Sequence, residues 1–239
     1  MNWIKENVEP YLPGTKIVGI AVGNEILGGT DIEIWEALLP SVKNVYAALQ
    51  RLNLHKKIEL SSPNSEAVFA NSFPPSACIF PPDIAVYMVP LLQFFSQIGS
   101  PFYINAYPYL AYKSDPEHID LNYAIFQPNS GIFDAKTNLH YDNMFDAQVD
   151  AAYAALEKAG FEKMKVIVSE TGKEAYKKFG CSSYFCRSGW DDDPAGVELA
   201  GSRSSYPTTT FWVIEERSLN RRGGSLFIFI GRGRRRELK

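Results

Sequence analysis

Two short apolar runs in this chain each end in a glutamate. The first run, KIVGIAVGNE, ends at Glu25, and the second, MKVIVSE, ends at Glu170. β-Branched and apolar residues in a run that is bounded by turn residues predict a strand buried on both faces. A carboxylate at the end of such a strand is costly unless it lies at an open rim, where it can be used. We therefore interpret both glutamates as candidate site residues.

The rest of the pattern alternates strands with helices. Apolar spacing predicts strands over 16–24, 57–60, 102–106 and 165–169, and helices over 31–52, 83–98 and 145–159. Pro40 is expected to interrupt or restart the first helix, and Pro90 to kink or restart the second. The apolar segment 225–230 predicts a fifth strand. Alternation of strand and helix favours an α/β fold, with a parallel sheet and crossover helices.

Composition is that of an ordinary globular protein, with 46% hydrophobic and 21% charged residues among 239. The sequence contains no apolar run of about 18 residues, so we expect no transmembrane segment. Its N-terminus lacks the apolar region of a signal peptide. The net charge is −3, yet residues 217–239 hold eight basic residues and one acidic residue. Such a tail could contact nucleic acid, but we interpret it as a solvated end and expect no nucleic-acid partner.

Residue types that bind metals are few and scattered: His55, His118, His140, Cys78, Cys181 and Cys186. No two histidines are four residues apart, and the cysteines show no C-x-x-C pairing. We interpret the cysteines as free thiols, with a local bridge between Cys181 and Cys186 as the alternative in an oxidising compartment. Phosphate-loop and Gly-x-Ser-x-Gly motifs are missing. We expect neither a metal nor a cofactor.

Two carboxylates that face one cleft are what glycoside hydrolysis requires. One donates a proton to the leaving oxygen, and the other attacks the sugar carbon or activates water. The alternative is that both glutamates are surface residues at strand ends. The tyrosine-rich stretch 105–112 suits stacking against sugars. We interpret Tyr109 and Tyr112 as packing or loop residues, and Asp146 as a residue at a helix N-terminus.

The two glutamate segments allow a family to be named. AVGNEILGG and VIVSETG resemble the acid and nucleophile motifs of family 17 glycoside hydrolases, the plant β-1,3-glucanases. Four further segments resemble the family in the same order along the chain, at 60–76, 100–116, 123–129 and 139–156. The resemblance covers about residues 3–172 and ends abruptly after Gly172.

The resemblance implies a TIM-barrel, (β/α)8, ancestry, incomplete here, with barrel strands four to seven present and the first three absent. It implies a retaining hydrolase with Glu25 as general acid/base and Glu170 as nucleophile, their carboxyl groups about 5–5.5 Å apart. Asn24 would bond the sugar 2-hydroxyl, although a turn-forming asparagine is the alternative. Asn105 and Tyr107 would line the cleft on one side of their strand, with Tyr107 bonded to Glu170.

The same resemblance gives expectations about organisation and partners. Residues 1–172 would form a partial hydrolase domain, and residues 173–239 a divergent segment with a basic tail. The substrate would be β-1,3-glucan, and the location extracellular or the plant cell wall. The alternative function is that of a non-catalytic, truncated glucanase remnant that at most binds glucan.

Overall fold

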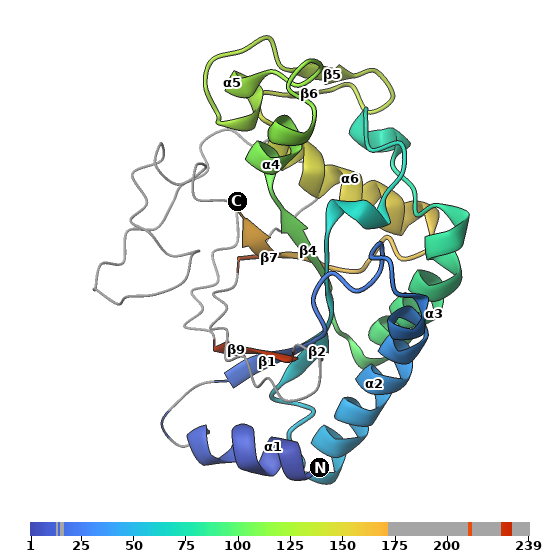
Figure 1. The fold of residues 1–239 in the computed structure, drawn as a ribbon, viewed down its shortest axis with the longest axis vertical. Coiled ribbons are helices and arrows are strands. Elements are labelled where there is room, and N and C mark those ends of the chain that lie inside the picture. Colours follow the sequence, from blue (N-terminus) through green and yellow to red (C-terminus); the bar gives the residue numbers. More distant parts are fainter. Residues whose placement is uncertain (13, 15–16, 172–209, 212–225, 231–239) are drawn as a thin grey trace.

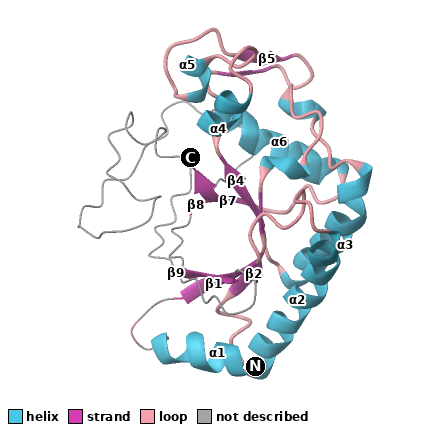
Figure 2. Ribbon diagram, viewed as in Figure 1, coloured by secondary structure: helices cyan, strands magenta, loops and turns pink. Residues whose placement is uncertain are grey.

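The structure is a computed structural model, and it describes residues 1–12, 14, 17–171, 210–211 and 226–230. The fold combines strands at the centre with helices along one side of them (Figure 1). Figure 2 shows the same view by type of element.

A row of parallel strands forms the centre. Strand β1 (Ile17–Val22) pairs with β2 (Glu59–Ser61), while β3 (Pro63–Asn64) pairs with β4 (Phe102–Ala106). Only Ser62 separates β2 from β3, so the segment 59–64 joins β1 on one side to β4 on the other. Strand β7 (Val166–Thr171) continues the row beside β4, and β8 (Thr210–Phe211) follows it, again parallel. This order places the carboxyl ends of β1, β3, β4 and β7 at one edge.

Three long helices connect these strands: α2 (Ile32–Arg51), α3 (Pro82–Ile98) and α6 (Met144–Lys158). Capping residues that are visible in the sequence mark three of the helix ends. Asp31 accepts hydrogen bonds from two backbone N–H groups of the first turn of α2, and the Asn143 side chain accepts one from the backbone N–H of Asp146 at the start of α6. Gly99 ends α3 in the left-handed conformation, with φ +72°, which costs glycine little. The predicted α/β alternation is therefore confirmed.

The two internal prolines do not divide their helices. Helix α2 runs through Pro40 and α3 runs through Pro90, so the predicted restart at Pro40 is wrong. A proline removes one backbone hydrogen bond and crowds the preceding turn. Here the apolar face continues on both sides of Pro40, with Leu38 and Val42 both buried. Burial of that face offsets the local loss, and the helix persists.

Several elements were not predicted. They are the N-terminal helix α1 (Asn2–Asn7) and 3₁₀ turn η1 (Glu9–Tyr11), the 3₁₀ turns η2 (Glu66–Val68) and η3 (Pro75–Ala77), helices α4 (Pro108–Ser114) and α5 (Leu121–Ala124), and the hairpin of β5 (Ile132–Asp134) and β6 (Leu139–Tyr141). Helices α4 and α5 and the hairpin lie beyond the carboxyl end of β4 (Figure 1). Asp134 of the hairpin is buried and accepts hydrogen bonds from the backbone N and the hydroxyl of Ser76. This tie holds the hairpin to the loop after β3.

The apolar segment near the C-terminus is a strand, β9 (Leu226–Ile230), as predicted. Its direction differs from that of the other strands, because β9 pairs antiparallel with the free edge of β1. It therefore occupies an edge and does not extend the parallel series. A sequence pattern shows that a segment suits a strand, but the edge that it joins depends on tertiary structure.

The core lies between the strands and the three long helices. Its fully buried side chains include Ile20, Leu49, Leu60, Met88, Leu92, Phe95, Phe102 and Val166. Burial of β4 and β7 on both faces agrees with their continuous apolar sequences. Within the described residues, no helix combines the length and apolar character needed to cross a bilayer.

Candidate active site

Glu25 lies just beyond the end of β1 in an unusual backbone conformation. Its φ is +52°, in the left-handed region that residues other than glycine seldom adopt. Its backbone N–H donates to the carbonyl oxygen of Pro63 at 2.9 Å, across to β3. The chain turns sharply here, because Gly23 also has a positive φ. The turn therefore holds Glu25 at the rim of the sheet, where its side chain is partly exposed.

Asn105 links the end of β1 to β4. Its side chain is buried, with 1% of its surface exposed. The amide Nδ2 donates to Oε1 of Glu25 at 2.8 Å and to Oδ1 of Asn24 at 3.1 Å. One amide group therefore holds the side chains of two consecutive residues.

Glu170 lies in β7, directly opposite Asn105 in the register of β4 and β7. The hydroxyl of Tyr107 donates to Oε2 of Glu170 at 2.7 Å. Tyr107 follows β4 immediately and is the residue that precedes α4. Helix α4 therefore begins directly after the tyrosine whose hydroxyl reaches Glu170 of β7.

The five residues singled out in the sequence come together at the carboxyl edge of the strands. Asn24 and Glu25 follow β1, Asn105 lies near the end of β4 with Tyr107 directly after that strand, and Glu170 lies in β7. Two hydrogen-bonded groups result, one around each glutamate. Asn105 connects them, because its side chain bonds Glu25 and its backbone lies opposite Glu170 in the sheet. The expected separation of 5–5.5 Å between the two carboxyl groups stays a prediction.

Ser169 is a further polar residue at this edge, and it was not among the site residues predicted from the sequence. Its hydroxyl donates to Oδ1 of Asn105 at 2.6 Å, and its side chain is fully buried. Alternation along a regular strand predicts that Ser169 points away from the face that Glu170 uses. Ser169 follows Ile167 by two residues and so already lies on the side of Tyr103 and Asn105, and the irregularity after Val168 brings Glu170 to that side as well. The sequence contained no signal for this irregularity.

Other candidates have structural partners outside the site. The rings of Tyr109 and Tyr112 pack on each other in α4, with centroids 5.9 Å apart, in line with their interpretation as packing residues. Asp146 lies in the first turn of α6 and accepts from Nδ2 of Asn143, the position expected for a helix N-terminus. Burial raises the pKa of Asp146.

Histidines and cysteines give no sign of a metal centre in the part of the chain that the structure describes. His118 pairs with Asp115, and His140 bonds Asp142 and the carbonyl of Ser130. No three histidine, cysteine or acidic side chains gather as metal ligands among the described residues. Cys78 is a buried free thiol, and burial raises its pKa to about 12. Cys181 and Cys186 lie outside the described residues.

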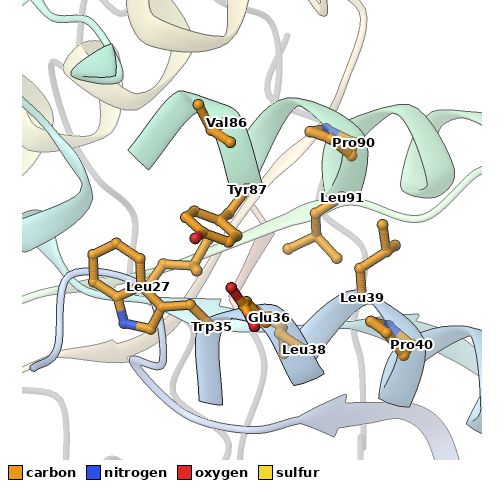
Figure 3. A pocket seen from close by; sticks show the side chains of 10 residues that line it. All are labelled: Leu27, Trp35, Glu36, Leu38, Leu39, Pro40, Val86, Tyr87, Pro90 and Leu91. Atoms are coloured by element: carbon orange, nitrogen blue, oxygen red, sulfur yellow. The ribbon is translucent and has the colours of Figure 1, made fainter. Parts of the chain in front are cut away.

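A hollow of about 300 Å³ lies between α2 and α3 (Figure 3). Its walls are mostly apolar, with Trp35, Leu38, Tyr87 and Leu91 among the lining residues and Glu36 as the charged one. The hollow shares no residue with the cluster around Glu25 and Glu170. It lacks the convergent polar groups that a catalytic site requires.

Comparison with known proteins shows which family this chain resembles. Residues 1–183 match the family described as glycosyl hydrolases family 17. Glucan endo-1,3-beta-glucosidase 14 of Arabidopsis thaliana is 47% identical over 171 residues, which are 72% of this chain and 44% of the relative. Glucan endo-1,3-beta-D-glucosidase of Olea europaea is 42% identical over 170 residues, which are 71% of this chain and 37% of the relative. The chain thus spans less than half the length of these relatives.

Solved structures show the same similarity. The β-1,3-glucanase CJP38, a pollen allergen of Cryptomeria japonica, matches with a TM-score of 0.68 and 38% identity, over 72% of this chain and 53% of that one. A structure from a study of two plant β-glucan endohydrolases matches with a TM-score of 0.64 and 36% identity. The row of parallel strands and its helices is accordingly part of a TIM barrel, the α/β fold of these enzymes. This chain belongs to the glycosyl hydrolases of family 17.

Proposed function

We propose that the chain carries the catalytic pair of a retaining β-1,3-glucan hydrolase. Glu25 is the general acid/base and Glu170 is the nucleophile in this proposal. The observation that carries it is the arrangement of the two glutamates at one edge of the strands, each held by a hydrogen bond from β4 or its end. The names of the relatives supply the substrate class, β-1,3-glucan. The site-bearing domain is residues 1–172 in this proposal.

The first step joins the sugar to the protein. A carboxylate oxygen of Glu170 attacks the anomeric carbon, and the bond from that carbon to the leaving oxygen breaks. Glu25 gives its proton to the leaving oxygen, so that the departing glucan leaves as an alcohol. The hydroxyl of Tyr107 fixes the direction of the Glu170 carboxylate through Oε2. Asn24 offers a side-chain amide to the sugar 2-hydroxyl.

The second step reverses these roles. Glu25, now ionised, takes a proton from water, and the water oxygen attacks the anomeric carbon. Glu170 leaves as a carboxylate, and the product keeps the β configuration after two inversions. The amide of Asn105 donates to Oε1 of Glu25, a contact that fixes the position of this carboxyl group. The corresponding location is extracellular or the cell wall, where the glucan substrate would be met.

Release of reducing sugar from laminarin by the purified chain tests this proposal. Glu170→Gln should remove nearly all turnover, and more than a few per cent of residual activity would contradict the nucleophile assignment. Glu25→Gln should slow laminarin hydrolysis strongly but spare the first step on aryl glucosides with good leaving groups, which need no proton. Equal loss on both substrates would contradict the role of Glu25.

A matched control and a second readout separate catalysis from folding. Glu162 is exposed and lies just before β7, so Glu162→Gln removes a carboxylate without touching the site. That variant should retain full activity. A circular dichroism melt of every variant should coincide with that of the parent chain. Binding of laminarin without any hydrolysis would favour the alternative function, a non-catalytic glucanase remnant.

A further inference from the structure

The pairing of β4 with β7 contains an irregularity at the proposed site. Tyr103 pairs with Ile167 and Ile104 with Val168, but the next residue, Asn105, pairs with Glu170. Ser169 is therefore the extra residue of β7. Two residues of one strand opposite one residue of its neighbour define a β-bulge, and bulges re-aim side chains next to active sites.

The bulge brings two consecutive side chains of β7 to one side of β4. In a regular strand, Ser169 and Glu170 would point to opposite faces. Here Ser169 donates to the side chain of Asn105, and Glu170 accepts from the side chain of Tyr107. Asn105 and Tyr107 are two residues apart, so their side chains share a side. Without the extra residue, only one of the two β7 side chains could reach that side.

The hydroxyl of Ser169 satisfies the carbonyl end of the Asn105 amide. An amide group has one accepting end and one donating end, so a donor at Oδ1 directs Nδ2 the other way. In this structure Nδ2 faces Glu25 and Asn24. The reversed amide would set its oxygen against the oxygens of both residues. All of these groups are buried or partly buried, where an unpaired polar atom is costly.

We propose, resting on the function proposed above, that Ser169 is a positioning residue for Glu25 and acts through Asn105. The bulge in β7 links the strand of the nucleophile to the acid/base by a chain of two hydrogen bonds, from Ser169 to Asn105 and from Asn105 to Glu25. Ser169 itself does not touch the substrate. Its effect is to hold one orientation of the amide while Glu25 loses and regains its proton.

Removal of the hydroxyl tests the proposal in two ways. In Ser169→Ala the buried Oδ1 of Asn105 loses its donor, so the amide is no longer held in one orientation. We expect about a tenfold loss of kcat/KM on laminarin, the effect of one lost hydrogen bond. The loss on the first step with activated aryl glucosides should be much smaller, because that step does not use the proton of Glu25. Ser169→Thr, which keeps a hydroxyl, should recover most of the activity.

A double-mutant cycle separates action through Asn105 from a general structural role. Asn105→Ala removes the group that Ser169 holds, so adding Ser169→Ala to it should cause no further loss. Additive losses, or equal losses on laminarin and aryl glucosides, would overturn the proposal. Thr171→Val is the matched control, because it removes a buried hydroxyl of the same strand that has no hydrogen-bond partner. It should leave the balance between the two substrates unchanged.

A measurement that does not depend on activity keeps this test separate from the test of function. The side-chain amide protons of Asn105, observed by NMR in the full chain, should exchange slowly in the parent protein and in Thr171→Val. In Ser169→Ala they should exchange at least tenfold faster and shift in position. Unchanged amide signals would overturn the proposal even if the chain hydrolyses glucan. Changed signals in a chain without hydrolysis would support the positioning role of Ser169 while contradicting the proposed function.

Discussion

Burial of Glu66 makes the stability of this protein depend on pH. The residue opens the 3₁₀ turn η2, directly after β3, and its Oε1 is inaccessible to solvent and has no hydrogen-bond partner. Burial raises the pKa of the Glu66 carboxyl from 4.5 to about 8. The folded protein therefore keeps this proton at pH values where the unfolded chain has lost it. The free energy of unfolding should decrease as pH rises from about 4.5 to about 8 and then level off.

The size of the effect follows from the shift. Each pKa unit corresponds to about 1.4 kcal/mol, so the full shift corresponds to roughly 5 kcal/mol. This value is an upper bound, because the residue as a whole is partly exposed. Glu66→Gln removes the titration and keeps the shape. We expect the variant to match the parent near pH 4.5 and to exceed it by about 2 kcal/mol or more at pH 8.5.

Urea unfolding at a series of pH values, followed by tryptophan fluorescence, measures this difference. Glu162→Gln, at an exposed position, serves as the control and should show no such pH dependence relative to the parent. An equal difference between Glu66→Gln and the parent at pH 4.5 and at pH 8.5 would show that burial does not raise the pKa of Glu66 in this way.

Three further substitutions test other contacts. Tyr107→Phe removes the hydrogen bond to Oε2 of Glu170, so kcat on laminarin should fall about 10- to 100-fold with little change in Tm, and an unchanged kcat would contradict the role of that bond. Leu92→Ala empties a fully buried position of α3 and should lower the free energy of unfolding in urea by about 2–5 kcal/mol; a loss below 1 kcal/mol would show that the site relaxes. Tyr141→Phe removes a buried hydrogen bond to Asp150 and should lower the free energy of unfolding by about 1–3 kcal/mol in the same assay. An unchanged free energy of unfolding would show that this hydrogen bond does not stabilise the fold.

The elements that repeat a simple period could be predicted from the sequence. The strand over 102–106 is exact, and the helix over 145–159 is correct within one residue at each end, because apolar spacing and terminal residues agree there. The hairpin β5–β6 and helix α4 were missed. Their strands have three residues each and α4 has seven, which is too short for a period to show. Tertiary ties such as the bonds between Ser76 and Asp134 hold such elements in place.

Part of the site could likewise be predicted from the sequence, and part could not. Strand ends predicted that Glu25 and Glu170 meet at one edge, since parallel strands present their carboxyl ends together. The hydrogen bond between Tyr107 and Glu170 followed from a family resemblance and is present in the structure. That Ser169 and Glu170 share one side of the sheet could not be predicted, because a bulge changes which face a side chain uses and leaves no mark in the composition of VIVSET.

Covalent trapping of the glycosyl intermediate identifies the nucleophile directly. A 2-deoxy-2-fluoro-β-glucosyl or laminaribiosyl fluoride slows both steps but keeps a good leaving group, so a glycosyl–protein intermediate accumulates in a retaining enzyme. After digestion with protease, mass spectrometry locates the added sugar. We expect a stoichiometric label on Glu170 in the parent chain and none in Glu170→Gln. A label on a different residue, or continued turnover of laminarin with no label at all, would contradict this expectation.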